Sequence, residues 1–261
     1  MKGRSRIPFQ LSLRSLRFSL RALREILITK EQMVSTPEGL EKKEVLMKLR
    51  IVISLMIAST GVFLLPLCAS KIRMLWNGRD FDGWTFVLET DGVKSSDVWS
   101  VKDGVILCKG VPNGFMRTND SHSNYRLHVE WRWPETAGNS GVFLHLNGPD
   151  KVWPNCIECQ LHAGNAGDFV LIGDSRITVE DSAYSVADRF QAIPKLRASS
   201  EKPAGEWNSY DITASGDSIR CSVNGVLQNE GAGAFRSEGP IGLQSEGAPI
   251  EFRNVWIQKV R

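Results

Sequence analysis

The feature that most constrains this sequence is an alternation of polar and apolar residues between Leu127 and Leu161. The alternation runs through three short segments, at 127–133, 138–145 and 156–162. A period of two is typical of strands that turn one face to solvent and the other to a core. If the registers of the three strands align, six polar side chains share one face of a sheet: Glu130, Arg132, His145, Glu158, Gln160 and His162. We take that face as the candidate functional site.

The rest of the chain after Leu75 also predicts strands and turns. No amphipathic helical segment is longer than about two turns. Two hairpins are expected, because Asp103-Gly104 and Asn224-Gly225 tolerate the positive φ of two-residue turns. Further strands are expected at 207–213, 241–245 and 251–260. The pattern predicts an all-β sandwich or barrel in one domain.

One long segment, 165–205, has only weak periodicity and contains Pro194 and Pro203. Long loops in compact domains are often functional. We therefore expect this segment to be a loop that forms a wall or lid over the polar face.

Composition and charge are those of an ordinary globular domain. Hydrophobic residues make up 42% of the chain and charged residues 23%, which is typical of a protein that buries a full core. Residues 71–261 contain 20 Lys and Arg against 24 Asp and Glu. A mildly acidic domain gives no reason to expect a nucleic-acid partner, because nucleic-acid binding requires a basic patch. The oligomeric state stays open.

Residues 47–70 have the pattern of a secretory signal peptide, with a short basic start, an apolar run and small residues at the end. The apolar run is shorter than the roughly 20 residues that a membrane span needs. We expect cleavage after Ser70 and a periplasmic or extracellular domain at 71–261, without a stable membrane span. A lipid anchor on Cys68 is the alternative.

Residues 1–46 precede this signal and are rich in Arg, Ser and Leu. An amphipathic helix or a transit peptide would have this composition. A translation start at Met47, which makes 1–46 a non-native or extended segment, is the interpretation that we favour.

Cys156 and Cys159 are spaced like a metal-binding or redox pair. Residues three apart on a strand point to opposite faces, so neither chelation nor a disulfide between the two is expected. We interpret both as small buried hydrophobic residues. An oxidised pair across strands stays open for an exported protein.

The segment 75–84, Leu-Trp-Asn-Gly-Arg-Asp-Phe-Asp-Gly-Trp, resembles the opening motif of the 3-keto-disaccharide hydrolase domain family, long known as a domain of unknown function. The match continues in order through 99–104, 138–142, 157–160, 205–210, 223–225, 239–244 and 251–255, and so covers nearly all of 75–260. The resemblance implies a concanavalin A-like jelly roll of two antiparallel sheets. It also implies export and action on oxidised sugars, and no cofactor is expected.

A 3-keto sugar permits a distinctive cleavage. Its C3 carbonyl acidifies the proton on C2, and the glycosidic oxygen on C1 lies β to that carbonyl. A base can remove the C2 proton to give an enolate, which expels the C1 oxygen, and water then adds to the double bond. This route needs a general base, a cation or donors for the enolate oxygen, and an acid for the leaving group.

The candidate face offers groups for each of these tasks. Glu158 and His162 lie on one strand and could act as base and acid, while Gln160 between them could hold a sugar hydroxyl. Arg132 could face the enolate. Five further residues are candidates for substrate binding, with Trp153 as a stacking platform: Glu130, His145, Trp153, Asp168 and Gln244.

Several of these residues have a purely structural interpretation. Glu130 and Arg132 could be a cross-strand ion pair on a solvated face, and Asp168 could serve turn formation. His145 stands where family members have Arg, so the family's role does not transfer to it directly. His145, His162 and Asp168 could ligate a cation, but no metal-ligand spacing stands out, and the metal requirement stays open.

The sequence also weighs against direct hydrolysis of unoxidised glycosides. Jelly-roll glucanases carry Glu-x-Asp-x-x-Glu on the corresponding strand, whereas this chain has Glu158, Gln160 and Ala163. The carboxylate pair of an ordinary glycosidase is therefore missing from that strand. The main alternative to an enzyme for 3-keto-glycosides is a non-catalytic carbohydrate-binding module.

Overall fold

The protein is described from a computed structural model that covers residues 70–260. The expectations for residues 1–46, for nearly all of the signal peptide and for Cys68 lie outside the described residues. Within residues 70–260, no helix is both long and apolar enough to cross a membrane.

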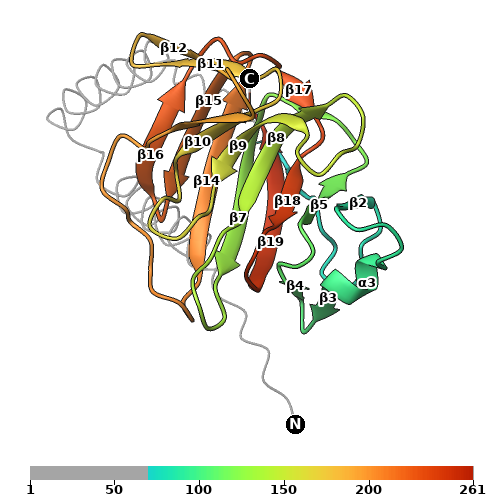
Figure 1. Ribbon diagram of the computed structural model, residues 1–261. Coiled ribbons are helices and arrows are strands. Elements are labelled where there is room, and N and C mark those ends of the chain that lie inside the picture. The colour runs from blue at the N-terminus through green and yellow to red at the C-terminus, as the bar shows by residue number, and fades with distance from the viewer. Residues whose placement is uncertain (1–69, 261) are drawn as a thin grey trace, which may run out of the picture. The chain divides into compact units, whose positions relative to one another are not determined.

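Two antiparallel sheets make up most of residues 70–260 (Figure 1). Sheet I has eight strands, in the order β16 (Val226–Gly231), β15 (Ser218–Val223), β14 (Asn208–Ser215), β7 (Tyr125–Arg132), β19 (Ile250–Lys259), β4 (Val105–Cys108) and β3 (Trp99–Lys102), with β1 (Ile72–Met74) also paired to β19. Sheet II has seven, in the order β13 (Phe190–Ile193), β10 (Phe169–Ile172), β9 (Asn155–Gln160), β8 (Gly141–Asn147), β18 (Gly242–Ser245), β5 (Gly114–Thr118) and β2 (Trp84–Leu88). The expected all-β jelly-roll sandwich is confirmed.

Smaller elements lie at the edges of the sandwich. The pair β11 (Arg176–Val179) and β12 (Ser182–Ser185) and the pair β6 (His122–Ser123) and β17 (Glu238–Gly239) form two-stranded sheets. A single short helix, α3 (Ser95–Val98), is found among the described residues. Figure 1 shows α3 beside β3, at the opposite side of the view from β11 and β12.

Both predicted hairpins are confirmed. β3 pairs with β4 across Asp103-Gly104, and β15 pairs with β16 across Asn224-Gly225. Asn224 and Gly225 have φ of 49° and 79°, the left-handed values that a two-residue hairpin turn requires. The Asn224 side chain also accepts a hydrogen bond from the backbone N–H of Ser209 at 2.9 Å, which ties the turn to β14.

Sheet I has one buried and one solvated face. Along β7 and β14, fully buried residues alternate with partly exposed ones. The buried set of β7, which includes Leu127, Val129 and Trp131, packs into the main core between the two sheets. The polar residues of β7 therefore lie on the outer face of sheet I, away from sheet II.

Sheet II carries buried apolar side chains on both faces. Its inner face supplies Val142, Leu144 and Ile157 to the main core. Its outer face carries a second buried cluster, to which Trp153 and Val87 add partly buried contacts: Phe115, Phe143, Leu146, Cys156, Val170 and Ile172. A run of six buried residues along β8 reflects this double burial, which is typical of strands inside a fold rather than at its surface.

The expectation that residues 165–205 form a long loop is wrong. This segment contains β10, β11, β12 and β13, and β10 and β13 extend sheet II beyond β9. Each of these strands has only four residues, too few for a period of two to stand out in the sequence.

The described cysteines are free thiols, and all four are buried. Cys156 belongs to the cluster on the outer face of sheet II, whereas Cys159 belongs to the main core. The prediction that the two point to opposite faces and do not bond to each other is confirmed.

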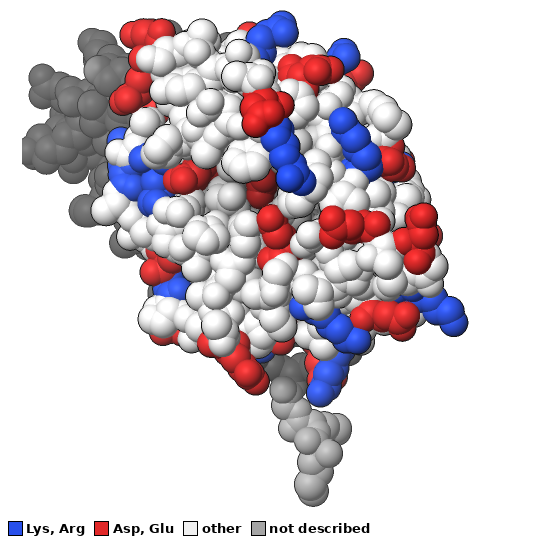
Figure 2. All heavy atoms as spheres, in the orientation of Figure 1, with Lys and Arg blue, Asp and Glu red and all other residues white. Residues whose placement is uncertain are grey.

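Charge is mixed over the surface. In Figure 2, acidic and basic side chains of the described residues are interspersed over the visible face, separated by wide uncharged areas. No large patch of one sign dominates that view of the described domain.

The packing around Phe252 predicts how much a large cavity in the core would lower the free energy of unfolding. Phe252 is fully buried in β19, where it faces Trp131 of β7 and Ile106 of β4 across the ladder. We expect Phe252→Ala to lower the free energy of unfolding by about 3–5 kcal/mol, measured by urea denaturation. Val226→Ala, at a side chain that is 40% exposed, should change it by less than about 0.5 kcal/mol.

Candidate functional site

Glu158 lies near the middle of sheet II, on the outer face of β9. It alternates with the inward-facing Ile157 and Cys159, and only 3% of its surface is exposed. Its carboxyl lies over Gly141 of the neighbouring strand, since a Cβ added to Gly141 would lie 2.0 Å from Glu158 Oε1. A glycine at position 141 therefore makes room for this carboxyl.

The Glu158 carboxyl has few means of stabilising a negative charge. Burial, and then the charge of Glu246, raise its pKa well above the ordinary value of 4.5. Its Oε1 atom is buried without a hydrogen-bond partner. An unpartnered buried polar atom is costly, and a carboxyl with a raised pKa is typical of sites of proton transfer.

Three polar side chains near Glu158 come from two other segments. Gln244 of β18 is 2% exposed, and neither its amide nitrogen nor its amide oxygen has a partner. Asn139 forms an isolated bridge with Glu246, and its Oδ1 atom is also buried and unpartnered. We call Glu158, Gln244, Glu246 and Asn139 the carboxyl cluster.

Glu246 is the second acid of this cluster. Burial raises its pKa. The amides of Gln244 and Asn139 oppose the rise, as do the charges of His162 and Arg189. The Gln244 amide lies near the Glu246 carboxyl but makes no hydrogen bond of ordinary geometry with it. Two carboxyls with raised pKa values are thus close enough for the charge of Glu246 to act on Glu158, and Glu158 is the more strongly shifted. Pairs of acids with separated pKa values are the arrangement that assigns one as proton donor and the other as acceptor.

A buried apolar cluster adjoins the carboxyl cluster, and the partly exposed Trp153 packs at its edge. Phe143 is the direct cross-strand partner of Glu158, and Phe115 packs against it with ring centroids 5.5 Å apart. Trp153 packs against the same apolar cluster, and the Arg189 guanidinium lies 5.3 Å from the centroid of the Trp153 ring. Apolar and aromatic walls with a few convergent polar groups are typical of small-molecule sites.

Gln160 and His162 lie at the end of β9. The Gln160 side-chain oxygen accepts hydrogen bonds from the backbone N–H groups of Leu161 and His162, both at 2.9 Å. His162 is exposed, and its Nδ1 lies 3.0 Å from Asn165 Nδ2. Gln160 therefore shapes the turn, whereas His162 lies at the rim, near enough to influence Glu246 electrostatically.

Asp168 is engaged by the chain that follows β13. Its Oδ1 accepts a hydrogen bond from the backbone N–H of Lys195 at 2.8 Å and lies 3.7 Å from Lys195 Nζ. Its backbone oxygen accepts from the N–H of Gln160 at 3.0 Å. Asp168 thus fastens the segment around Lys195 to the end of β9.

The expectation that Glu130 and Arg132 share a face with Glu158 is wrong. They lie on β7, which belongs to sheet I, and their side chains occupy its outer face. Glu130 accepts a hydrogen bond from Arg253 Nε at 2.6 Å, and Arg132 Nε donates to Glu251 at 2.5 Å. Both are cross-strand ion pairs between β7 and β19. The chain passes from sheet I to sheet II between β7 and β8, so the polar faces of β7 and β9 lie on opposite sides of the sandwich.

His145 is also absent from the outer face of sheet II. A register irregularity between Leu144 and Asn147 and a φ of 55° at His145 break the alternation of β8. The ring contacts the Tyr125 hydroxyl at 3.2 Å through Nε2 and the Arg236 carbonyl at 2.9 Å through Nδ1. Burial lowers its pKa to about 4.

The sequence left open a cation site formed by His145, His162 and Asp168. The structure does not bring these residues together, because His145 contacts Tyr125 and Asp168 binds Lys195. Among residues 70–260, no group of three or more His, Cys, Asp or Glu side chains is placed to hold a metal ion.

The sequence alone predicted no role for four residues of this region: Asn139, Gly141, Arg189 and Glu246. The alternation of Gln244 and Glu246 was a usable signal for Glu246. Asn139 and Gly141 stand in a turn-like Asn-Ser-Gly run, and nothing in the sequence points to Arg189. Their proximity depends on the pairing of β8 with β9 and β18, which brings distant segments together.

Comparison with known proteins identifies the family of the chain. Residues 71–258 match the family described as the 3-keto-alpha-glucoside-1,2-lyase-like domain. The chain belongs to this family. The matched residues include nearly all of sheets I and II. The resemblance to this family that the sequence motifs indicated is confirmed.

Individual relatives agree with the family. A 3-keto-disaccharide hydrolase of Bacteroides thetaiotaomicron is 24% identical over 249 residues, which cover 78% of this chain and 84% of that protein. A crystal structure of a candidate glycosyl hydrolase from Parabacteroides distasonis has a TM-score of 0.55 and 22% identity, and covers 73% of this chain and 94% of that one. A second from the same organism has a TM-score of 0.52 and 19% identity, with 73% and 100% covered. The structural likenesses establish the shared fold.

The raised pKa of Glu158 predicts how stability depends on pH. The folded state binds the Glu158 proton more tightly than the unfolded chain, so wild type loses stability as pH rises from about 4.5 towards the raised pKa, by up to about 1.4 kcal/mol per pH unit. Glu158→Gln lacks this loss. We therefore expect the variant to gain stability relative to wild type from pH 4 to pH 8, measured by urea denaturation.

Glu130→Gln is the matched control. Burial opposes ionisation of Glu130, but hydrogen bonds from Asn254 and Arg253 outweigh it and lower the pKa. The carboxylate therefore stabilises the fold above pH 4.5, and this contribution is lost as pH falls. This variant should be less stable than wild type near pH 7 and approach it in acid. The same pH trend in both variants would contradict the assignment.

Proposed function

We propose that this protein is a glycosidase that cleaves the glycosidic bonds of 3-keto-glycosides by elimination followed by hydration. The observation that carries the proposal is the pair of carboxyls with raised pKa values, Glu158 and Glu246, beside the unpartnered amide of Gln244. Membership of the 3-keto-alpha-glucoside-1,2-lyase-like family supports it, as does the relative named a 3-keto-disaccharide hydrolase.

The first step assigns opposite proton roles to the two carboxyls. Glu246 loses its proton at lower pH than Glu158, because it is less deeply buried and lies near the charges of His162 and Arg189. Glu246 as carboxylate takes the C2 proton of the 3-keto ring. The resulting enolate expels the C1 oxygen, and Glu158 as carboxylic acid gives its proton to that oxygen.

The second step reverses these roles. Glu158, now a carboxylate, accepts a proton from water as the water oxygen bonds to C1. The proton on Glu246 exchanges with solvent during the lifetime of the intermediate, and Glu246 then gives a proton to C2. Both carboxyls regain their starting states, and the net reaction is hydrolysis.

The remaining groups stabilise charge and hold the ring. The Gln244 amide N–H donates to an oxygen of the oxidised ring, where the enolate charge develops. Arg189 supplies the cation that we had assigned to Arg132 from the sequence, since Arg189 lies beside Trp153 and influences Glu246. Trp153, which is partly exposed, contacts the apolar C–H face of the sugar. His162, at the rim, limits the rise in the pKa of Glu246 together with the larger effects of the Gln244 and Asn139 amides.

Turnover of matched substrates tests this proposal. Purified protein given a 3-keto-glucoside should release the aglycone, whereas the unoxidised glucoside should be stable. Glu246→Gln and Glu158→Gln should each lower kcat by about 10²–10⁴-fold, the usual contribution of a general acid or base. Glu130→Gln and Arg132→Met, on the outer face of sheet I, should retain wild-type activity.

Solvent deuterium separates elimination from direct displacement. In D₂O, early product formed by elimination and hydration carries deuterium at C2, while direct displacement at C1 leaves the C2 hydrogen in place. Cleavage of the unoxidised glucoside without C2 exchange would make the protein an ordinary glycosidase that uses Glu158 and Glu246 as its pair. Glycan binding without any product would support the carbohydrate-binding module.

We further propose that the mature domain is exported, with cleavage after Ser70. The support is the basic start, apolar run and small residues of 47–70. N-terminal sequencing of the protein from its native host should begin at Lys71. A mature chain that retains residues from 1–46 would contradict the proposal, and a lipid-modified Cys68 would support the anchored alternative.

A further inference from the structure

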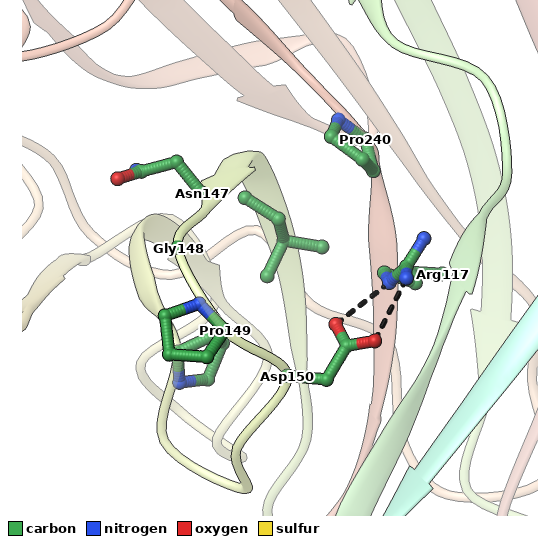
Figure 3. A pocket seen from close by; sticks show the side chains of 8 residues that line it. Arg117, Asn147, Gly148, Pro149, Asp150 and Pro240 are labelled. Atoms are coloured by element: carbon green, nitrogen blue, oxygen red, sulfur yellow. Dashed lines mark hydrogen bonds and ion pairs between the residues drawn. The ribbon is translucent and has the colours of Figure 1, made fainter.

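A hollow lies on the outer face of sheet II, outside the carboxyl cluster. It has a volume of about 270 Å³, just under the roughly 300–1,000 Å³ of pockets for drug-sized ligands. Figure 3 shows it between the loop after β8 and the strand that carries Arg117, with these residues at its wall: Arg117, Asn147, Gly148, Pro149, Asp150 and Pro240. A ligand of the size of one sugar ring suits this volume.

Arg117 and Asp150 form a two-pronged pair across the hollow (Figure 3). Arg117 Nε donates to Asp150 Oδ1 at 2.9 Å and Nη2 donates to Oδ2 at 2.8 Å. Hydrogen bonding to Asp150 is the main cause that raises the pKa of Arg117. The side chains are 22% and 44% exposed, so each remains accessible while the pair holds its geometry.

The pair retains capacity to bind a ligand. A guanidinium has five N–H donors and a carboxylate about four acceptor positions. The pair uses two donors and two acceptor positions, and Nη1 makes one long contact with the Thr118 carbonyl at 3.4 Å. Because Asp150 neutralises Arg117, the hollow suits an uncharged molecule with several hydroxyl groups better than a phosphate or a carboxylate.

The register of sheet II aligns this hollow with the carboxyl cluster. Arg117 pairs with Gly242, Gly242 pairs with Phe143, and Phe143 pairs with Glu158. The four residues form one row across four strands on the same face. Three inter-strand steps of about 4.8 Å place the Cα atoms of Arg117 and Glu158 roughly 14 Å apart. This separation is comparable to the length of two linked sugar rings.

We propose that the hollow at Arg117 and Asp150 is a second sugar subsite, which binds the leaving sugar of a disaccharide while the oxidised ring lies at the carboxyl cluster. This inference rests on the proposed function and deepens it, because it makes a 3-keto-disaccharide the preferred substrate over a 3-keto-glycoside with a small aglycone. Arg117 and Asp150 bind hydroxyl groups of the leaving sugar. The prolines at positions 149, 154 and 240 give the subsite stiff walls.

Conservative variants and two substrates test the subsite. Arg117→Lys keeps the charge but loses the two-pronged geometry, and Asp150→Asn keeps the shape. Each should lower kcat/KM on a 3-keto-disaccharide by about tenfold or more, and change kcat/KM on the matching methyl 3-keto-glucoside by less than twofold. Arg126→Lys, which alters an exposed ion pair with Asp211 on sheet I, is the matched control. Thermal unfolding checks that each variant folds.

Two outcomes would overturn the inference: unchanged kcat/KM on the disaccharide, or an equal loss on both substrates. If wild type cleaves neither substrate, the proposed function fails, and the subsite is then judged by calorimetry. Wild type should bind the unoxidised disaccharide more tightly than the methyl glucoside, and Arg117→Lys should abolish that preference. Equal binding of both sugars by wild type would refute the subsite as well.

Discussion

The burial of sheet II on both faces is the constraint on which the rest of the structure depends. The inner face packs on sheet I, and the outer face carries a second apolar cluster around Phe115 and Phe143. A carboxyl placed on that outer face loses most of its hydration, as the exposed fraction of Glu158 shows. Its raised pKa follows from this desolvation more than from any single neighbour. The carboxyl fits there because residue 141 is a glycine and has no Cβ to clash with it.

The two outer faces of the sandwich treat polar groups in opposite ways. On sheet I, the polar side chains toward the end of β7 form ion pairs, Glu130 with Arg253 and Arg132 with Glu251. On sheet II, Glu158 and Gln244 keep buried atoms without partners. Satisfied pairs stabilise a surface and need nothing further, whereas unsatisfied buried groups impose a cost that a ligand can relieve. This difference, rather than the number of polar residues, distinguishes the candidate site from a solvated sheet.

The sequence predicted the fold more successfully than the site. The hairpins at Asp103-Gly104 and Asn224-Gly225 depend on local turn chemistry, so their residues were sufficient to predict them. The short strands of 165–205 were missed, because four residues carry too little periodicity. At the site, Glu158 and Gln244 were predicted from the sequence, whereas no role was predicted for Glu246 or Arg189.

What the sequence determined by itself was the family, the all-β class and the alternation of each strand, because motif order, turn residues and the period of two are local properties. Only the tertiary structure decided which polar faces meet. Glu130 and Arg132 have the same alternation as Glu158, yet β7 pairs with β14 and β19 in sheet I, while β9 pairs with β8 and β10 in sheet II. Alternation fixes the side of a strand on which a residue lies. Pairing between distant segments decides which sheet contains the strand. The sheet in turn decides whether the residue faces solvent or another buried side chain.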